Sequence, residues 1–247
     1  MCDKDFCTLY SLFMLALARK ELSACSFRLF VGEKPLLPQI IEDLSTKATE
    51  EELKEAFTDE WGVKYSKDGR KLLKAPQELK GCYSVKEGTR MICDEVFWYS
   101  CSLSNIVIPG SVTSIGNWAF KGCTSLSNIV IPNSVTSIGD WAFSDCTSLS
   151  NIVIPDSVTN IGDDVFYQCS SLTSVVIPNS VTSIGVSVFW GCSSLVNMDI
   201  PDSVTRIGDW AFVNCSNLSY DLKQELISRF GDELFKLPLH FPAFLKS

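Results

Sequence analysis

Hydrophobic and polar residues recur along the middle of the chain with a fixed period of 23 residues. Segment 103–109 reads LSNIVIP, and the same seven letters return at 126–132 and 149–155. Looser copies stand at 172–178 and 195–201. A fixed period of this length is typical of a solenoid, whose units cannot bury their apolar face alone and therefore stack on copies of themselves.

Each unit contains a pattern that predicts a short β-strand. Ile106 and Ile108 alternate with Asn105 and Val107, which is the two-residue period of a strand with one buried face. Pro109 should end that strand because it has no amide proton to donate.

A second extended segment is expected from Val112 to Ile115, with Gly116 as the turn that follows it. Because successive units stack, their strands should form parallel ladders about 4.8 Å apart. The predicted fold is a right-handed leucine-rich-repeat solenoid, built mostly of short parallel β-strands and turns.

The residues expected inside the coil fall into columns 23 apart. The leucine column is Leu103, Leu126, Leu149, Leu172, Leu195 and Leu218. The isoleucine column is Ile115, Ile138, Ile161, Ile184 and Ile207. The phenylalanine column is Phe97, Phe120, Phe143, Phe166, Phe189 and Phe212. Stacked aromatic rings bury large apolar areas, so we expect the phenylalanine column to be the main source of stability.

Composition and local signals divide the chain into four parts. Residues 1–60 should form a helical N-terminal domain, with helices at 6–30 and 38–44 and a third that opens with a capping box at Thr49 and runs to Phe57. Residues 61–79 read as a β-hairpin linker around the Asp68-Gly69 turn. The solenoid covers 80–218, with 80–102 as a degenerate first repeat. Residues 219–247 should form a C-terminal helical cap and tail, with a helix at 220–230 that begins after Ser219 and ends at Gly231.

The first residues allow two interpretations. The apolar run 9–18 ends in Ala-Leu-Ala, which resembles a signal-peptidase site, but Asp3 and Asp5 precede it where a signal peptide has positive charge. Apolar residues also continue beyond Lys20, as they would along a packed helix. A packed helix is favoured, and a cleaved signal stays open.

The repeat I-P-x-S-V-T-x-I-G-x-x-A-F-x-x-C closely resembles the BspA-like, Treponema-type leucine-rich repeats. The resemblance covers about 115 residues strongly, because the proline, glycine, phenylalanine and cysteine recur in register. It implies a protein partner, such as a host matrix or cell-surface protein, and a secreted or cell-surface location. If the chain has no signal, a cytoplasmic location is the alternative. Fold does not determine function, so these implications are analogies.

Charge and residue types exclude several classes of function. The net charge of −8 and the lack of a basic patch argue against a nucleic-acid partner, and no apolar run reaches the length of a membrane span. His240 is the only histidine, so Ser/His catalysis has no support, and no phosphate-binding loop or dinucleotide fingerprint occurs. We expect no enzyme activity and no cofactor; oligomeric state is left open.

Recurring cysteines and aspartates have structural interpretations. The column Cys123, Cys146, Cys169, Cys192 and Cys215 is expected to hold buried free thiols, with disulfides or a metal site as lesser alternatives. The Asp residues at 140, 163 and 209 and at 156 and 202 suit turns, with weak calcium binding as the alternative. No metal ligands are assigned.

The candidate binding residues are the outward positions of the first strand. They are Asn105, Val107, Asn128, Val130, Asn151, Val153, Ser174, Val176, Asn197 and Asp199. An outward valine column could bind a protein, or could reflect only the preference of β-branched residues for strands. Trp118, Trp141 and Trp210 recur where other copies carry Asp164 or Ser187, so they are either exposed binding residues or partly packed against the next coil. We therefore expect a non-catalytic protein-binding module with cell-surface adhesion as its role; an intracellular interaction or regulatory scaffold is the alternative.

Overall fold

The computed structural model describes residues 30–31, 34–35 and 45–237, and the chain divides into two units, 1–44 and 45–247. In the first unit, β1 (Phe30–Val31) pairs antiparallel with β2 (Lys34–Pro35). The end of the helix expected at 6–30 is therefore wrong at Phe30. The rest of that helix, the helix at 38–44, the signal-like run 9–18, His240 and the tail 238–247 lie outside the described residues.

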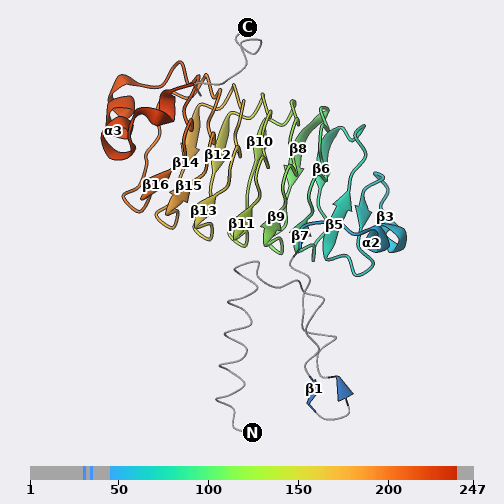
Figure 1. Ribbon diagram of the computed structural model, residues 1–247. Helices are drawn as coiled ribbons and strands as arrows, with labels where there is room; N and C mark the ends of the chain where they lie inside the picture. The colour runs from blue at the N-terminus through green and yellow to red at the C-terminus, as the bar shows by residue number, and fades with distance from the viewer. Residues whose placement is uncertain (1–29, 32–33, 36–44, 238–247) are drawn as a thin grey trace. The chain divides into compact units, whose positions relative to one another are not determined.

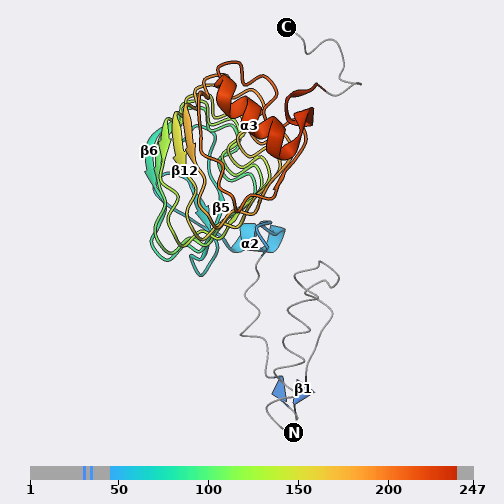
Figure 2. The ribbon, with the colours of Figure 1, turned by 90° about the vertical axis from the view of Figure 1, so that its left-hand side faces the viewer.

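The repeats of the second unit contribute short strands that line up in two rows along the coil (Figure 1). The first row contains β6 (Gly81–Ser84), β8 (Leu103–Val107), β10 (Asn128–Ile129), β12 (Asn151–Val153) and β14 (Ser174–Val176). The second row contains β5 (Lys71–Lys74), β7 (Met91–Ile92), β9 (Ser114–Ile115), β11 (Ser137–Ile138), β13 (Asn160–Ile161), β15 (Ser183–Ile184) and β16 (Arg206–Ile207). Seen along the coil axis in Figure 2, successive turns of chain superimpose around a common interior. The right-handed sense of the coil stays a prediction.

The strands pair in the register that the 23-residue period predicts. Asn105 lies opposite Asn128, and Ile115 lies opposite Ile138, both in parallel pairs. Ile106 is 2% exposed and Val107 is 51% exposed, so the alternation of buried and exposed residues is confirmed. No strand is assigned to the copy at 195–201, where Asp199, a poor strand residue, replaces the valine of the other copies.

A third side of the coil is formed by turns that also bond from repeat to repeat. The Phe120 N–H donates to the Ala142 carbonyl (2.8 Å), and the Phe143 N–H donates to the Val165 carbonyl (3.0 Å). Two positions per repeat, two residues before and two residues after the phenylalanine, have positive φ; Trp118 is at 54° and Asp145 at 59°. This left-handed backbone turns the chain while its amides remain bonded to the next coil.

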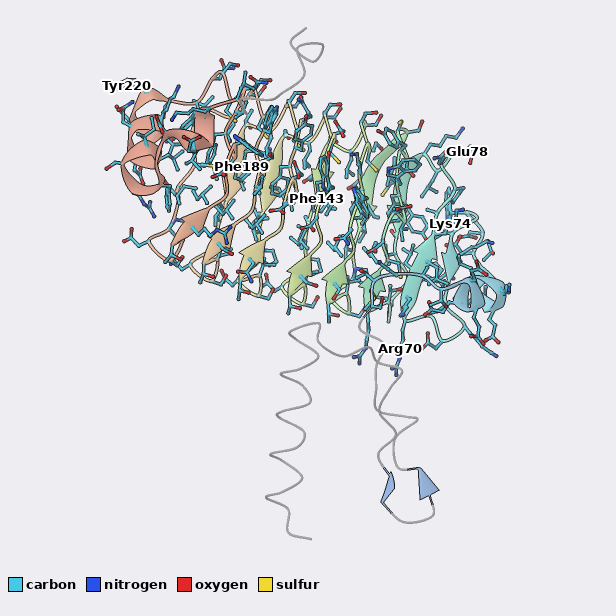
Figure 3. The ribbon with its side chains drawn as sticks, viewed as in Figure 1. Arg70, Lys74, Glu78, Phe143, Phe189 and Tyr220 are labelled. Atoms are coloured by element: carbon cyan, nitrogen blue, oxygen red, sulfur yellow. The ribbon has the colours of Figure 1, made fainter. Side chains whose placement is uncertain are left out.

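The phenylalanine column is the centre of the core. Rings in successive repeats stack nearly parallel, with centroids 5.1 Å apart for Phe97 and Phe120 and 5.8 Å apart for Phe143 and Phe166. Figure 3 labels Phe143 and Phe189 among the side chains between the strand rows and the turns. Phe97 stacks in line, so the degenerate repeat 80–102 continues the column at its N-terminal end.

The N-terminal flank of the solenoid combines a short helix with a hairpin. Thr49 opens α2 (Glu50–Glu55) with the predicted capping box. The expected continuation of this helix through Phe57 is wrong, because Ala56 is extended and Phe57 begins β3 (Phe57–Thr58), which pairs with β4 (Lys64–Tyr65). The hairpin turn at Gly69 is present, with a φ of +74°. Its second strand, β5, also pairs with β7, so the hairpin is continuous with the second strand row.

At the C-terminal side, α3 (Tyr220–Phe230) has the predicted bounds, and η1 (Asp232–Phe235) follows it. Leu222 and Leu226 are buried in the common core. The Phe235 ring stacks 5.9 Å from Phe212, and the Arg229 guanidinium donates to the Ile200 and Pro201 carbonyls. No helix among the described residues has the length and hydrophobicity that crossing a membrane requires.

Candidate functional site

The outward side chains of the first strand row form one exposed surface, which we call the strand face. It contains all ten predicted residues, and all ten are exposed: Asn105, Val107, Asn128, Val130, Asn151, Val153, Ser174, Val176, Asn197 and Asp199. The exposed fractions of the valines are 51% for Val107, 71% for Val130, 59% for Val153 and 54% for Val176. Asn197 and Asp199 lie after β14, beyond the last strand of this row.

A polar column runs beside these valines. The Ser174 hydroxyl donates to the Asn151 side-chain oxygen (3.0 Å), and the Asn151 amide donates to the Ser150 hydroxyl (3.0 Å). The first of these bonds links two neighbouring repeats, and the second joins adjacent residues of one repeat. The strand face thus combines an apolar stripe with polar side chains that carry hydrogen-bond donors and acceptors.

The three predicted tryptophans lie on the turn side of the coil. Trp118 is 36% exposed, whereas Trp141 and Trp210 are half-buried. Trp141 packs against Tyr167, with ring centroids 5.5 Å apart, and the Lys121 ammonium lies 4.3 Å from the Trp141 ring centroid. The Trp141 side chain is therefore both partly packed and partly exposed.

Lys121 and Tyr167 were not among the candidates expected from the sequence. Both occupy the position directly after a core phenylalanine, where the copies differ from one another. That difference among otherwise near-identical repeats was the available signal, since a position free to vary within such an array is not needed for stacking.

The residues after the repeat glycines form a ladder of side-chain hydrogen bonds. Each carboxylate or amide oxygen accepts from a backbone N–H 23 residues further along: Asn117 to Asp140 (2.9 Å), Asp140 to Asp163 (3.0 Å) and Asp163 to Val186 (2.7 Å). These contacts support the structural interpretation of Asp140 and Asp163. Val186 has no side-chain acceptor and interrupts the series.

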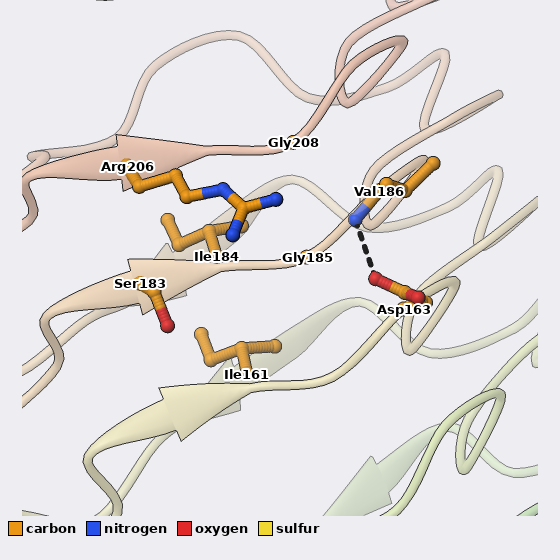
Figure 4. A pocket seen from close by; sticks show the side chains of 8 residues that line it. All are labelled: Ile161, Asp163, Ser183, Ile184, Gly185, Val186, Arg206 and Gly208. Atoms are coloured by element: carbon orange, nitrogen blue, oxygen red, sulfur yellow. Dashed lines mark hydrogen bonds between the residues drawn. The ribbon is translucent and has the colours of Figure 1, made fainter.

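A shallow cavity of about 200 Å³ lies at this interruption, between Asp163 and Arg206 (Figure 4). It is small beside the ~300–1,000 Å³ of typical ligand pockets. We therefore assign no small-molecule site to it.

The repeat glycines have a different role from the one expected. Gly116 and Gly139 do not have positive φ, so they are not needed to turn the chain. A Cβ atom on Gly139 would lie 2.5 Å from the Asn117 backbone nitrogen. Close approach of one coil to the next is what excludes a side chain at these positions.

The cysteine column forms a ladder of free thiols. Each thiol donates to the carbonyl of the phenylalanine 26 residues earlier; the Cys169 sulfur lies 3.1 Å from the Phe143 oxygen. Burial raises the pKa of Cys169 well above the ordinary thiol value, and it raises that of Cys123 to about 12. Within the described residues, no three His, Cys, Asp or Glu side chains form a cluster able to hold a metal ion. The ladder contacts account for these cysteines as structural residues.

The stacked repeats define the chain as a leucine-rich-repeat solenoid of about six turns. The family model described as "BspA type Leucine rich repeat region" matches residues 90–219 in six copies. The chain therefore belongs to the BspA-type leucine-rich-repeat family. Proteins of the leucine-rich-repeat class generally bind other proteins and are not catalysts. No curated protein sequence matches the chain.

Several solved structures are similar to this chain. The leucine-rich-repeat protein of Treponema pallidum is 27% identical, with a TM-score of 0.60 over 74% of this chain and 95% of that one. A leucine-rich-repeat protein from Eubacterium ventriosum is 24% identical (TM-score 0.53, 76% of this chain and 53% of that one). The pneumococcal vaccine antigen PcpA is also 24% identical (TM-score 0.54, 72% and 46%). This chain thus matches only about half the length of the last two proteins, and their likeness concerns the fold alone.

Proposed function

We propose that this chain is a non-catalytic protein-binding module that engages its partner through the strand face. The observation that carries the proposal is the valine column, in which each of four consecutive repeats exposes more than half of a valine side chain. Soluble proteins rarely expose large contiguous apolar stripes, and those that do commonly use them for binding.

The size of the stripe constrains how a partner binds. Four strands spaced about 4.8 Å apart place the outer valines roughly 15 Å from each other. A standard interface buries about 800 Å² on each partner, which is more than such a stripe offers. The neighbouring Asn and Ser side chains, including the bonded pair Asn151 and Ser174, must therefore take part as a polar rim.

A binding experiment with a charged stripe tests this proposal. Full-length protein carrying Val130→Asp, Val153→Asp and Val176→Asp is compared with wild type for capture of an interacting protein from cell-surface and cytosolic extracts. Burying three unpaired carboxylates in an interface is strongly unfavourable, so capture should fall at least tenfold. Undiminished capture would exclude the strand face.

The repeat itself offers a matched control. Gly110→Asp, Asn133→Asp and Asn179→Asp also add three charges, at positions where other copies already carry Asp156 and Asp202. This control should fold and should capture the partner as wild type does. If it fails equally, the effect is one of net charge and not of the stripe.

The finer role that we propose is adhesion at a cell surface. The family resemblance supports it. An intracellular interaction scaffold is the second candidate, favoured by the free and exposed Cys82 and Cys101, because unpaired thiols persist best in a reducing compartment. Cell fractionation separates the two: recovery of the chain only from the cytosol would refute adhesion.

A further inference from the structure

The turn side of the coil concentrates the chemical differences among the repeats. The name turn face is used for the side chains at two positions in each repeat. The first position lies two residues before the core phenylalanine, and the second lies one residue after it. The first position carries Glu95, Trp118, Trp141, Asp164, Ser187 and Trp210. The second carries Trp98, Lys121, Ser144, Tyr167, Trp190 and Val213. The next position, two after the phenylalanine, also varies, so the residues on either side of the phenylalanine differ strongly among the copies.

The backbone at the first of these positions is left-handed. Trp118, Trp141 and Trp210 have φ values of 54°, 59° and 61°. Asp164 and Ser187 hold the same position with φ values of 55° and 53°, so this backbone belongs to the turn of every repeat and different side chains are accepted there.

Aromatic rings on this face meet in two separate groups. The Trp141 and Tyr167 centroids are 5.5 Å apart, and the Tyr167 and Trp190 centroids are 6.0 Å apart. Further along, Trp98 and Tyr99 are each 44% exposed and meet edge to face at 4.8 Å. Trp190 is buried, so the accessible rings of the first group are those of Trp141 and Tyr167, with Trp118 partly exposed in the preceding repeat.

The molecule already places one of its own cations on this surface. The Lys121 ammonium lies 4.3 Å from the centroid of the Trp141 ring and 3.9 Å from an oxygen of the Asp145 carboxylate. A cation that meets a ring face and a carboxylate together is held by both the ring quadrupole and the opposite charge.

Negative charge exceeds positive charge within the repeats, and five of the eight aspartates, Asp140, Asp145, Asp163, Asp164 and Asp209, stand at or near the turn-face positions in the sequence. Residues 103–217 carry eight aspartates and no glutamate against Lys121 and Arg206, a balance of −6. Burial, and then the charges of Asp163 and Asp140, raise the pKa of Asp164 to about 6 despite the opposing charge of Lys121. One lysine therefore does not neutralise this group of carboxylates.

We propose that the turn face is a second docking surface, which binds a segment of a partner protein rich in Lys or Arg side chains. The rings of Trp118, Trp141 and Tyr167 contact the cationic side chains, and the surrounding aspartates supply the complementary charge. Charge complementarity identifies this occupant: the contact of Lys121 with Trp141 and Asp145 shows the mode of recognition within one chain. The proposal rests on the proposed protein-binding function but uses a different surface.

The experiment is a titration of the full-length protein with a fluorescein-labelled hexa-arginine peptide at low ionic strength, followed by fluorescence anisotropy. Wild type should bind it saturably, and a hexa-glutamine peptide should not bind. The key variant is Trp141→Ser, which leaves the charge unchanged and places at this position the residue that Ser187 already provides in another copy. Loss of a cation–π contact worth about 0.5–2 kcal/mol should weaken binding roughly 2- to 30-fold.

Three further variants separate the outcomes. Lys121→Met frees the ring and should strengthen binding, whereas Asp164→Ser should weaken it. The strand-face variant Val153→Ser should bind the peptide as wild type does, so that failure of the strand-face proposal and failure of this one are distinguishable. Circular dichroism verifies that each variant is folded.

Three results would overturn the proposal. One is the absence of saturable binding to the wild type at low salt. The second is Trp141→Ser binding as tightly as wild type while Asp164→Ser weakens binding, since that pattern means general attraction to an acidic surface and no use of the rings. Weaker binding by Val153→Ser would place the peptide on the strand face and would also refute the turn face.

Discussion

Replacing Phe166 by alanine tests whether the stacked rings are the main source of stability. Phe166 is fully buried, and its ring lies between Phe143 at 5.8 Å and Phe189 at 5.7 Å, each within 9° of parallel. Truncation removes the apolar area of the ring, both stacking contacts, and the material that fills the middle of the coil. The backbone around it is held in hydrogen-bonded ladders, so the cavity cannot collapse easily.

The expected loss is about 3–5 kcal/mol in the free energy of unfolding, the usual cost of truncating a buried phenylalanine. For a unit of this size it corresponds to a fall in melting temperature of roughly 6–20 °C. Urea denaturation followed by far-UV circular dichroism and by tryptophan fluorescence measures the loss. Because a solenoid is stabilised by contacts between neighbouring repeats, a lower m-value with non-coincident transitions would mean that the two halves unfold separately.

Two control variants should lose less stability than Phe166→Ala. Val153→Ala changes an exposed side chain and should alter the free energy of unfolding by less than about 0.5 kcal/mol. Phe235→Ala removes a half-buried ring that stacks on Phe212 at the end of the column. Its cost in unfolding free energy should therefore lie between those of Val153→Ala and Phe166→Ala. A loss below ~1 kcal/mol for Phe166→Ala would contradict the assignment of the column as the dominant core.

Other predictions concern backbone contacts, pH and thiols. Gly139→Ala should destabilise by about 1–3 kcal/mol, because its Cβ meets backbone, whereas Gly110→Ala, with open space around it, should be neutral or slightly stabilising; urea midpoints check the order. The pKa of Asp164 is raised to about 6 from 3.8, so its ionisation opposes folding as the pH rises. The free energy of unfolding of Asp164→Asn should therefore be about 1 kcal/mol greater than that of wild type at pH 7, a figure already reduced to allow for solvent screening. This difference in stability should disappear by pH 4. In native protein, iodoacetamide with peptide mass spectrometry should label exposed Cys101 and spare Cys169, whose thiol is buried and bonded; native labelling of Cys169 would refute the ladder.

Much of the fold could be predicted because the repeat states its register in the sequence itself. Ile106 and Val107 lie on opposite faces in every copy, so their burial and exposure followed from the period of two. The helix that begins after Ser219 was predicted from a cap residue and a terminal glycine. The end of α2 was predicted wrongly at Phe57, since pairing with Tyr65 in the hairpin overrode local helix signals.

The contacts that could not be predicted join residues in different repeats. Nothing local shows that the Cys169 thiol donates to Phe143, 26 residues earlier, or that the Asp140 carboxylate accepts from Asp163. The excluded side chain at Gly139 likewise depends on how closely one coil approaches the next. Lys121 over Trp141 is a further example, because the two side chains meet only once the repeats have stacked.

By itself the sequence determined which residues share a column, because a strict 23-residue period assigns every position of one copy to the same place in all the others. It therefore determined the buried Leu, Ile, Phe and Cys columns and the exposed valines of the strand face. Only the tertiary structure decided which neighbouring columns touch. Stacking brings together side chains from different repeats and sets how closely the coils approach, and that spacing is what creates the polar ladder, the thiol ladder and the aromatic turn face.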